Sequence, residues 1–137
     1  MDYFESAFGS YNPDVDPNFA VKFILNCMLS EDRLKELNYL LLDGHEVGGV
    51  EGEPGWIVER QDTERDGSIT AYDDWPEGAT FRAYVEPHSF KLGYPQNFLS
   101  TQEFHEYVRK ALVSYVAKKS SKGPIVEEII SLLRRCP

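Results

Sequence analysis

The middle of the chain alternates hydrophobic and polar side chains in three short runs. These runs span Trp56–Arg60, Ser68–Tyr72 and Thr80–Val85. Alternation with a period of two is typical of strands that have one buried and one exposed face. Asp66-Gly67 and the segment Pro76-Glu77-Gly78 separate the runs, and both are turn signals. We therefore predict an antiparallel meander over this part of the chain.

Two further short strands fit the pattern on either side of the meander. Residues 44–55 form a loop rich in glycine, and a short strand is predicted within it at Glu46–Val50. Glu86–Phe98 mixes proline and glycine with aromatic residues, which predicts a short strand with a covering loop. The predicted sheet therefore has three to five strands.

Helical spacing of apolar residues dominates the N-terminal part of the chain. Asp16-Pro17 has the pattern of an N-cap followed by proline at the first helical position, and apolar residues recur from Phe19 to Met28. Ser30 is predicted to cap a second helix, whose apolar face runs from Leu34 to Leu41 and which ends at Asp43-Gly44.

Capping and spacing signals in the C-terminal part of the sequence predict two more helices. Ser100 and Glu103 form a capping box, which opens a helix that reaches about Lys118. Residues 120–123 form a break, and Pro124 starts a last helix with an apolar stripe. The fold class is thus α+β: an antiparallel sheet packed against two N-terminal and two C-terminal helices, in a single domain over residues 1–137.

Composition adds an uneven distribution of charge. The chain has 137 residues, 42% of them hydrophobic, which is sufficient for one ordinary core, and a net charge of −9. Residues 43–86 hold twelve acidic and three basic side chains, whereas residues 87–137 hold four acidic and eight basic ones. An acidic field of this kind repels nucleic acid and anionic membranes and attracts basic partners.

The remaining composition favours a cytoplasmic protein. The first residues lack a basic segment followed by a long apolar run, so no signal peptide is predicted, and no run reaches the length of a membrane span. Cys27 and Cys136 are interpreted as reduced thiols because two cysteines do not form a disulfide framework.

The strongest functional candidate is an acidic and aromatic surface at the ends of the predicted strands. Tyr72 and Tyr84 are expected on the exposed face of the predicted sheet. Tyrosine, tryptophan and surrounding charge are typical of protein-binding hot spots. Two simpler interpretations stay open: the carboxylates serve only solubility, and Trp75 only covers the end of the core. The predicted partner-binding residues are Asp62, Glu64, Asp66, Tyr72, Asp73, Asp74 and Trp75.

The segment Asp62–Asp73 follows the calcium loop of EF-hand proteins at four positions. Glu64 is longer than the usual third ligand, and Asp73 is too short for the usual bidentate glutamate at the last position. The flanking glycines and prolines also exclude the two helices of an EF-hand. We interpret the segment as a hairpin turn and expect no tight calcium site.

No catalytic or metal-binding arrangement emerges from the remaining residues. His45, His88 and His105 lack the spacing of a metal site, and His105 is expected at the surface or at its boundary. No phosphate-binding glycine loop is present. We therefore expect no enzyme, no catalytic residue, no metal and no cofactor.

Several features together resemble the immunity proteins of bacterial polymorphic toxins, with those of contact-dependent growth inhibition nearest. The resemblance covers about Trp56–Lys119. It consists of an acidic α+β chain, the turn Asp74-Trp75-Pro76-Glu77-Gly78 between strands, and the helix start Ser100-Thr101-Gln102-Glu103-Phe104 followed by tyrosines. The resemblance implies neutralisation of a cognate toxin domain, commonly a nuclease, inside the producing cell.

Other functions remain open at the level of sequence. An acidic adaptor or regulatory module that binds another basic protein would have the same charge pattern. A calcium-binding module and an enzyme are the further alternatives. The sequence does not specify the oligomeric state.

Overall fold

The structure, a computed structural model, describes residues 7–9, 12–42, 49–53, 55–61, 75–87 and 93–135. Two N-terminal helices, α2 (Phe19–Ser30) and α3 (Leu34–Leu41), precede the sheet. Two C-terminal helices, α4 (Thr101–Lys118) and α5 (Gly123–Arg135), follow it, with the 3₁₀ turn η1 (Ser120–Lys122) between them. The α+β class and the placement of two helices before and two after the sheet are confirmed.

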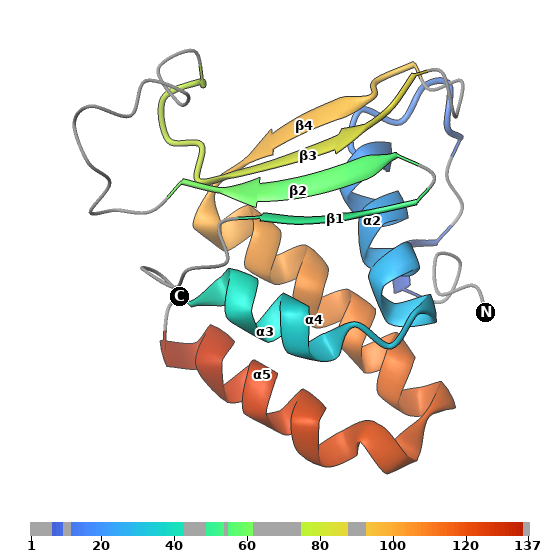
Figure 1. Cartoon of the computed structure of the whole chain (residues 1–137), viewed down its shortest axis with the longest axis vertical. Helices are drawn as coiled ribbons and strands as arrows, with labels where there is room; N and C mark the ends of the chain where they lie inside the picture. The colour runs from blue at the N-terminus through green and yellow to red at the C-terminus, as the bar shows by residue number, and fades with distance from the viewer. Residues whose placement is uncertain are drawn as a thin grey trace.

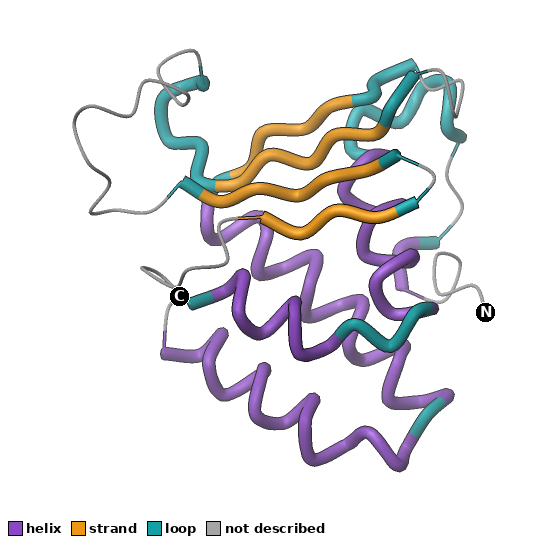
Figure 2. Tube along the Cα trace, viewed as in Figure 1, coloured by secondary structure: helices purple, strands orange, loops and turns teal. Residues whose placement is uncertain are grey.

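Four antiparallel strands form the sheet in the described part of the chain: β1 (Gly49–Gly52), β2 (Trp56–Arg60), β3 (Phe81–Val85) and β4 (Gln96–Leu99). They lie side by side in chain order, β1-β2-β3-β4. Figure 1 shows the helices on one side of this sheet, with α5 farthest from it. Figure 2 shows the same arrangement coloured by type of secondary structure.

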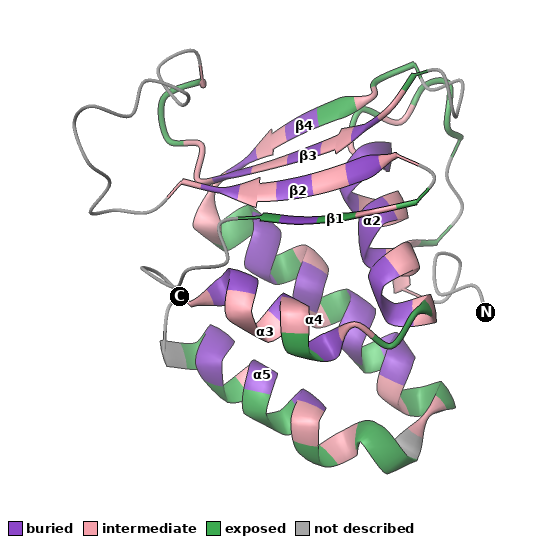
Figure 3. Ribbon diagram, viewed as in Figure 1, coloured by how far each residue is buried: buried purple, intermediate pink, exposed green. Residues whose placement is uncertain are grey.

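The alternation of side chains decides which face of the sheet is buried. In β2 and β3, the first, third and fifth residues are buried and the other two are half-buried. Phe81 of β3 stacks on Phe104 of α4 with ring centroids 4.1 Å apart, and neither side chain is exposed. Figure 3 shows the buried residues of the helices turned toward each other and toward the sheet. Apolar burial on one face therefore joins the sheet to its helices.

The order of the meander differs from the prediction. β2 and β3 pair directly, with Trp56 opposite Val85, so no strand lies between them. The predicted strand Ser68–Tyr72 lies outside the described residues, and its predicted place between these two strands is wrong. Hydrophobic alternation indicates that a segment suits a strand, but it does not specify the neighbour with which the segment pairs.

The starts of the N-terminal helices also require correction. Ser30 does not cap the second helix but ends α2, because Met28 and Leu29 belong to the buried stripe of α2 and keep it helical to this point. The first helix starts at Phe19 rather than Pro17. Asp16 still serves the helix start, because its Oδ1 accepts a hydrogen bond from the Asn18 N–H at 2.9 Å and its Oδ2 accepts one from Lys22 Nζ at 2.7 Å.

The C-terminal helices follow the prediction more closely. The capping box of α4 is present, with Ser100 Oγ accepting from the Glu103 N–H at 3.1 Å and Glu103 Oε1 accepting from the Ser100 N–H at 2.9 Å. α5 starts at Gly123, one residue before the predicted Pro124. Of the predicted strand Glu46–Val50, only Gly49 and Val50 are described, and both lie in β1.

Two buried polar side chains of the sheet cap the ends of helices. Asn97 of β4 accepts a hydrogen bond from the Val21 N–H in the first turn of α2 at 3.0 Å, and its Nδ2 donates to the Pro17 carbonyl. Arg60 of β2 donates from Nη1 to the Leu40 carbonyl in the last turn of α3 at 2.9 Å. Such terminal amides and carbonyls have no partner within their own helix. The sheet therefore supplies these caps across the core.

A second long-range contact fixes the turn between α2 and α3. Asp32 adopts a left-handed backbone with φ of 56°. Its Oδ1 accepts a hydrogen bond from the buried Tyr115 hydroxyl at 2.6 Å and another from Lys119 Nζ at 2.8 Å. These donors from the end of α4 hold the turn in a conformation that few residues other than glycine adopt.

We predict that Asn97→Leu lowers the free energy of unfolding by about 1–3 kcal/mol, because it leaves the buried Val21 N–H without this partner and removes the hydrogen bond to the Pro17 carbonyl. Asn97→Asp should also destabilise the protein at neutral pH, because a carboxylate keeps the acceptor but faces the Pro17 carbonyl with an oxygen. Urea denaturation followed by circular dichroism measures both effects. Gln102→Ala, at an exposed position of α4, is the control and should stay within about 0.5 kcal/mol. Equal stability of Asn97→Leu and the parent would contradict the capping role.

The Asp32 contact predicts a loss of stability in acid. Hydrogen bonds from Lys119 and Tyr115 lower the pKa of Asp32 in the folded protein. The stabilisation is therefore complete above the pKa of an unfolded aspartate and is lost as the pH falls through the lower pKa of the folded state. Asp32→Asn should flatten the dependence of stability on pH in this acidic range. Tyr115→Phe, which keeps the carboxylate but removes one donor, should give an intermediate slope in the same denaturation series, and identical slopes for all three proteins would refute this assignment.

Candidate protein-binding surface

The sheet has one face that no described helix covers (Figure 1). We call this the open face and define it by the outward side chains of the four strands. The register places Glu51, Ile57, Tyr84 and Gln96 in one row across the strands, with Glu59, Arg82 and Phe98 in the next row. The members of the open face are Glu51, Ile57, Glu59, Arg82, Tyr84, Gln96 and Phe98.

Arg82 lies at the centre of the open face and is held there by its neighbours. Its Nη1 lies 3.0 Å from Glu59 Oε2, and its Nε donates to Gln96 Oε1 at 2.6 Å. The guanidinium carbon lies 4.7 Å from the centroid of the Tyr84 ring. Because Arg82 is partly exposed, the ion pair contributes little to stability. Its effect is to hold one arginine, one tyrosine and one carboxylate in a fixed arrangement.

Trp75 extends the open face beyond the strands. Its ring is half-buried and meets the Phe98 ring edge-to-face, with centroids 5.4 Å apart and an angle of 64° between the planes. Since Phe98 points away from the helices, this contact lies on the side of the sheet opposite the main core. Trp75 thus forms an aromatic pair at one end of the open face.

A hollow of about 530 Å³ lies at the β1–β2 hairpin beside the open face. Three acidic residues, Glu51, Glu53 and Glu86, are among those that line it, together with Ile57 and Tyr84. No basic side chain is among the lining residues of the described chain. The chemistry of this hollow suits a cationic group that carries apolar carbon, such as a lysine or arginine side chain.

The sequence-predicted site residues are only partly placed by the structure. Trp75 is described and lies next to the open face. Tyr84, expected on the exposed face of its strand, does lie there. Six predicted partner-binding residues lie outside the described residues, so their role stays a prediction: Asp62, Glu64, Asp66, Tyr72, Asp73 and Asp74.

Sequence reasoning missed the acidic residues at the β1–β2 hairpin. The sequence pattern groups Glu51 and Glu53 with a glycine-rich loop, although Glu51 lies in β1. The missed signal is the alternation across the hairpin, where Val50 is buried and Glu51 is exposed. Phe98 was missed because hydrophobic strand residues are usually assigned to the core.

Side chains that could bind a metal do not cluster among the described residues. No group of three or more histidine, cysteine, aspartate or glutamate side chains that could hold a metal occurs among them. The expectation for His105 was wrong, since its side chain is only 4% exposed, with its ring 6.4 Å from that of Phe81. It is buried because it lies on the sheet-facing side of α4, next to Phe104.

Comparison of the chain with protein families, curated proteins and solved structures found no match. Among the described helices, none combines the length and the apolar character needed to cross a lipid bilayer.

Cys27 is predicted to react slowly with thiol reagents. Burial, assisted by the nearby Glu31 carboxylate, raises its pKa to about 11. The thiolate is the reactive form, so alkylation should be slow at neutral pH and should accelerate as the pH rises toward this value. Iodoacetamide labelling of a Cys136→Ser variant, followed by mass spectrometry, measures the rate against pH. A rate that saturates near pH 8 would show an activated thiol and contradict the assignment.

Proposed function

We propose that this protein is an immunity protein of a bacterial polymorphic toxin system, which binds and neutralises a cognate toxin domain through its open face. The observation that carries this proposal is a sheet face without a described helix on it, which combines carboxylates with aromatic side chains. Glu51 and Glu59 lie on the open face, and the hollow beside it adds Glu53 and Glu86. Arg82 is the one basic residue among the defined members of this face.

The expected partner is a basic protein surface. A nuclease must present cationic groups to the phosphates of its substrate, so a carboxylate-rich surface can occupy the same groups. Opposite charges also accelerate association at low ionic strength. The resemblance to the immunity proteins of contact-dependent growth inhibition points in the same direction. The resulting function is that of an inhibitor rather than an enzyme, acting in the bacterial cytoplasm.

The aromatic residues would supply most of the affinity. Protein interfaces concentrate binding energy in a few central aromatic and arginine side chains, surrounded by polar groups that exclude water. Trp75 and Phe98 already contact each other, so little conformational freedom would be lost when a partner covers them. The carboxylates around them would then act mainly on the rate of association and on specificity.

The test combines growth and binding measurements. The protein is co-expressed with candidate toxin domains, and a cognate pair is identified by restored growth. For that pair, Glu51→Lys/Glu53→Lys should slow association about tenfold or more at low salt, with a smaller effect at high salt. Trp75→Ala should weaken binding by about 2 kcal/mol or more if it is a central anchor. Biolayer interferometry measures both effects, with circular dichroism as the folding control.

Glu127→Lys/Glu128→Lys is the matched control, because it makes the same change of charge at exposed positions of α5. It should leave association nearly unchanged. If the α5 variant slows association as much as the sheet variant, only net charge matters and the open face is not the interface. If no toxin is neutralised but another basic protein binds the open face, the protein is an acidic adaptor instead.

A further inference from the structure

Arg82 occupies the middle of the open face. It lies on the inner strand β3, opposite Glu59 of β2 and Phe98 of β4. The other charged members of the open face, Glu51 and Glu59, are both acidic. A cation at the centre of such a surface weakens its attraction for a uniformly basic partner. The position of Arg82 therefore points to a role other than general attraction.

The guanidinium of Arg82 is held in place before any partner binds. Its Nη1 donates to Glu59 Oε2 at 3.0 Å, and its Nε donates to Gln96 Oε1 at 2.6 Å. The ring of Tyr84 lies on the same side of the strand, with its centroid 4.7 Å from the guanidinium carbon. Because two hydrogen bonds and a ring contact already fix this group, it loses little conformational freedom when a partner covers it.

Part of the same guanidinium still has donors to offer. An arginine side chain has five N–H groups. In Arg82, Nε and Nη1 donate to neighbours, whereas Nη2 makes no hydrogen bond within the described part of the chain. The side chain is 23% exposed, so a protein that covers the open face can reach it. A partner without an acceptor at this point would take water away from a charged donor and give nothing in return, which weakens binding.

We propose that Arg82 binds an aspartate or glutamate side chain of the toxin and thereby selects the cognate toxin among basic proteins. This inference rests on the proposed function and specifies one feature of the partner, an acidic residue within its basic surface. A carboxylate accepts hydrogen bonds and also neutralises a guanidinium that is removed from water. A toxin with a cation or an apolar group at this position is rejected, because the interface would bury Arg82 without that partner.

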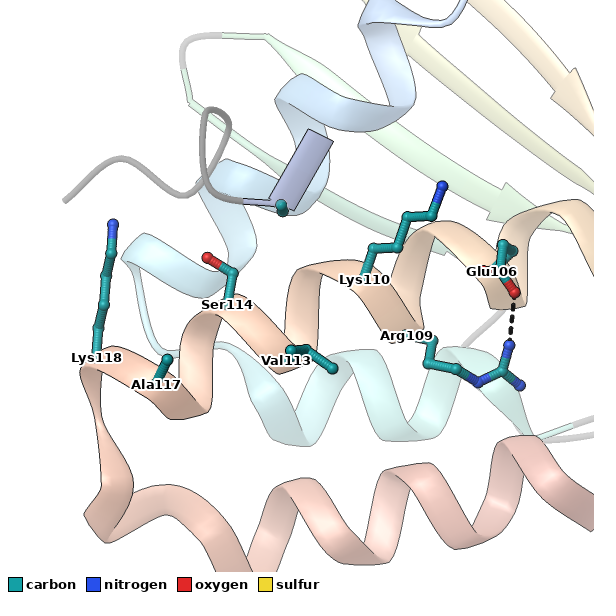
Figure 4. Close-up of a pocket in the computed structure, with 8 residues that line it drawn as sticks. Glu106, Arg109, Lys110, Val113, Ser114, Ala117 and Lys118 are labelled. Atoms are coloured by element: carbon teal, nitrogen blue, oxygen red, sulfur yellow. Dashed lines mark hydrogen bonds and ion pairs between the residues drawn. The ribbon is translucent and has the colours of Figure 1, made fainter. Parts of the chain in front are cut away.

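The free protein tests whether Arg82 is held in advance. Arg109 is the matched comparison: Figure 4 shows it on α4, where its Nη1 lies 2.8 Å from Glu106 Oε2. The Nε of Arg109 has no hydrogen-bond partner among the described residues. In proton–nitrogen correlation spectra, the Nε–H of Arg82 should therefore exchange with water more slowly than that of Arg109, and Gln96→Ala should remove the difference. Equal exchange rates in the parent protein would overturn the proposal, because the guanidinium would then not be held.

Binding to the cognate toxin, measured by biolayer interferometry, tests the contact itself. Arg82→Met removes the guanidinium and should weaken binding about 30-fold or more, mainly through faster dissociation. Arg82→Lys keeps the charge but not the fork of donors, and should recover only part of this loss. Arg109→Met makes the same change on the helix side of the sheet and should bind like the parent. Circular dichroism verifies that each variant is folded.

The acidic residue of the toxin is identified by changing each of its aspartates to asparagine and each of its glutamates to glutamine. One of these changes should weaken binding about as much as Arg82→Met. Combined with Arg82→Met, it should cost little more than either change alone, because both remove the same contact. If the losses multiply for every acidic residue of the toxin, no toxin carboxylate contacts Arg82 and the proposal is overturned.

This inference and the proposed function fail in different ways. If no toxin is neutralised, or if Glu51→Lys/Glu53→Lys leaves association unchanged, the proposed function fails and the role of Arg82 fails with it. If a toxin is neutralised and that double variant slows association, but folded Arg82→Met binds like the parent, only the role of Arg82 is overturned.

Discussion

The sheet of this protein completes the ends of the helices that cover it. α2 lacks a side-chain cap of its own, and Asn97 from β4 accepts the hydrogen bond of an amide in its first turn. Arg60 from β2 donates a hydrogen bond to a carbonyl in the last turn of α3. A helix end that is buried must find partners for its backbone groups. Here the partners come from the layer against which the helices pack, so sheet and helices cannot form their native ends separately.

The two faces of the sheet carry different side chains, because one packs against the helices and the other has no described helix on it. The helix-facing positions hold large apolar side chains together with two polar ones, each with a defined hydrogen bond. The opposite positions hold carboxylates, an arginine and aromatic rings, a mixture that suits contact with water or with another protein. Alternation alone thus gives the strands one face for the core and a second face of mixed polar and aromatic side chains.

Local signals in the sequence predicted the elements, whereas non-local contacts determined how they join. The capping box at Ser100 and the alternation of Trp56–Arg60 involve neighbouring residues, and both predictions are confirmed. The pairing of β2 with β3 was not predictable from alternation, because hydrophobic period does not identify a partner strand. The burial of His105 was missed for a similar reason, since only the arrangement of α4 against the sheet decides it. Of the candidate surface, Trp75 and Tyr84 were predicted, but the glutamates at the hairpin were hidden within a glycine-rich segment.

The hydrogen bonds that fix the start of α2 and the turn after it join positions far apart in the sequence. This distance affects the order of folding. The Asn97–Val21 hydrogen bond joins positions 76 residues apart, and the Tyr115–Asp32 bond joins positions 83 residues apart. Contacts between distant positions form slowly, because a long loop must close before they are gained. During synthesis, α2 and α3 leave the ribosome long before β4 and α4, so their ends first meet only water. The start of α2 and the turn between α2 and α3 therefore depend on the last third of the chain to become fixed, and a chain interrupted before Asn97 lacks the groups that complete them.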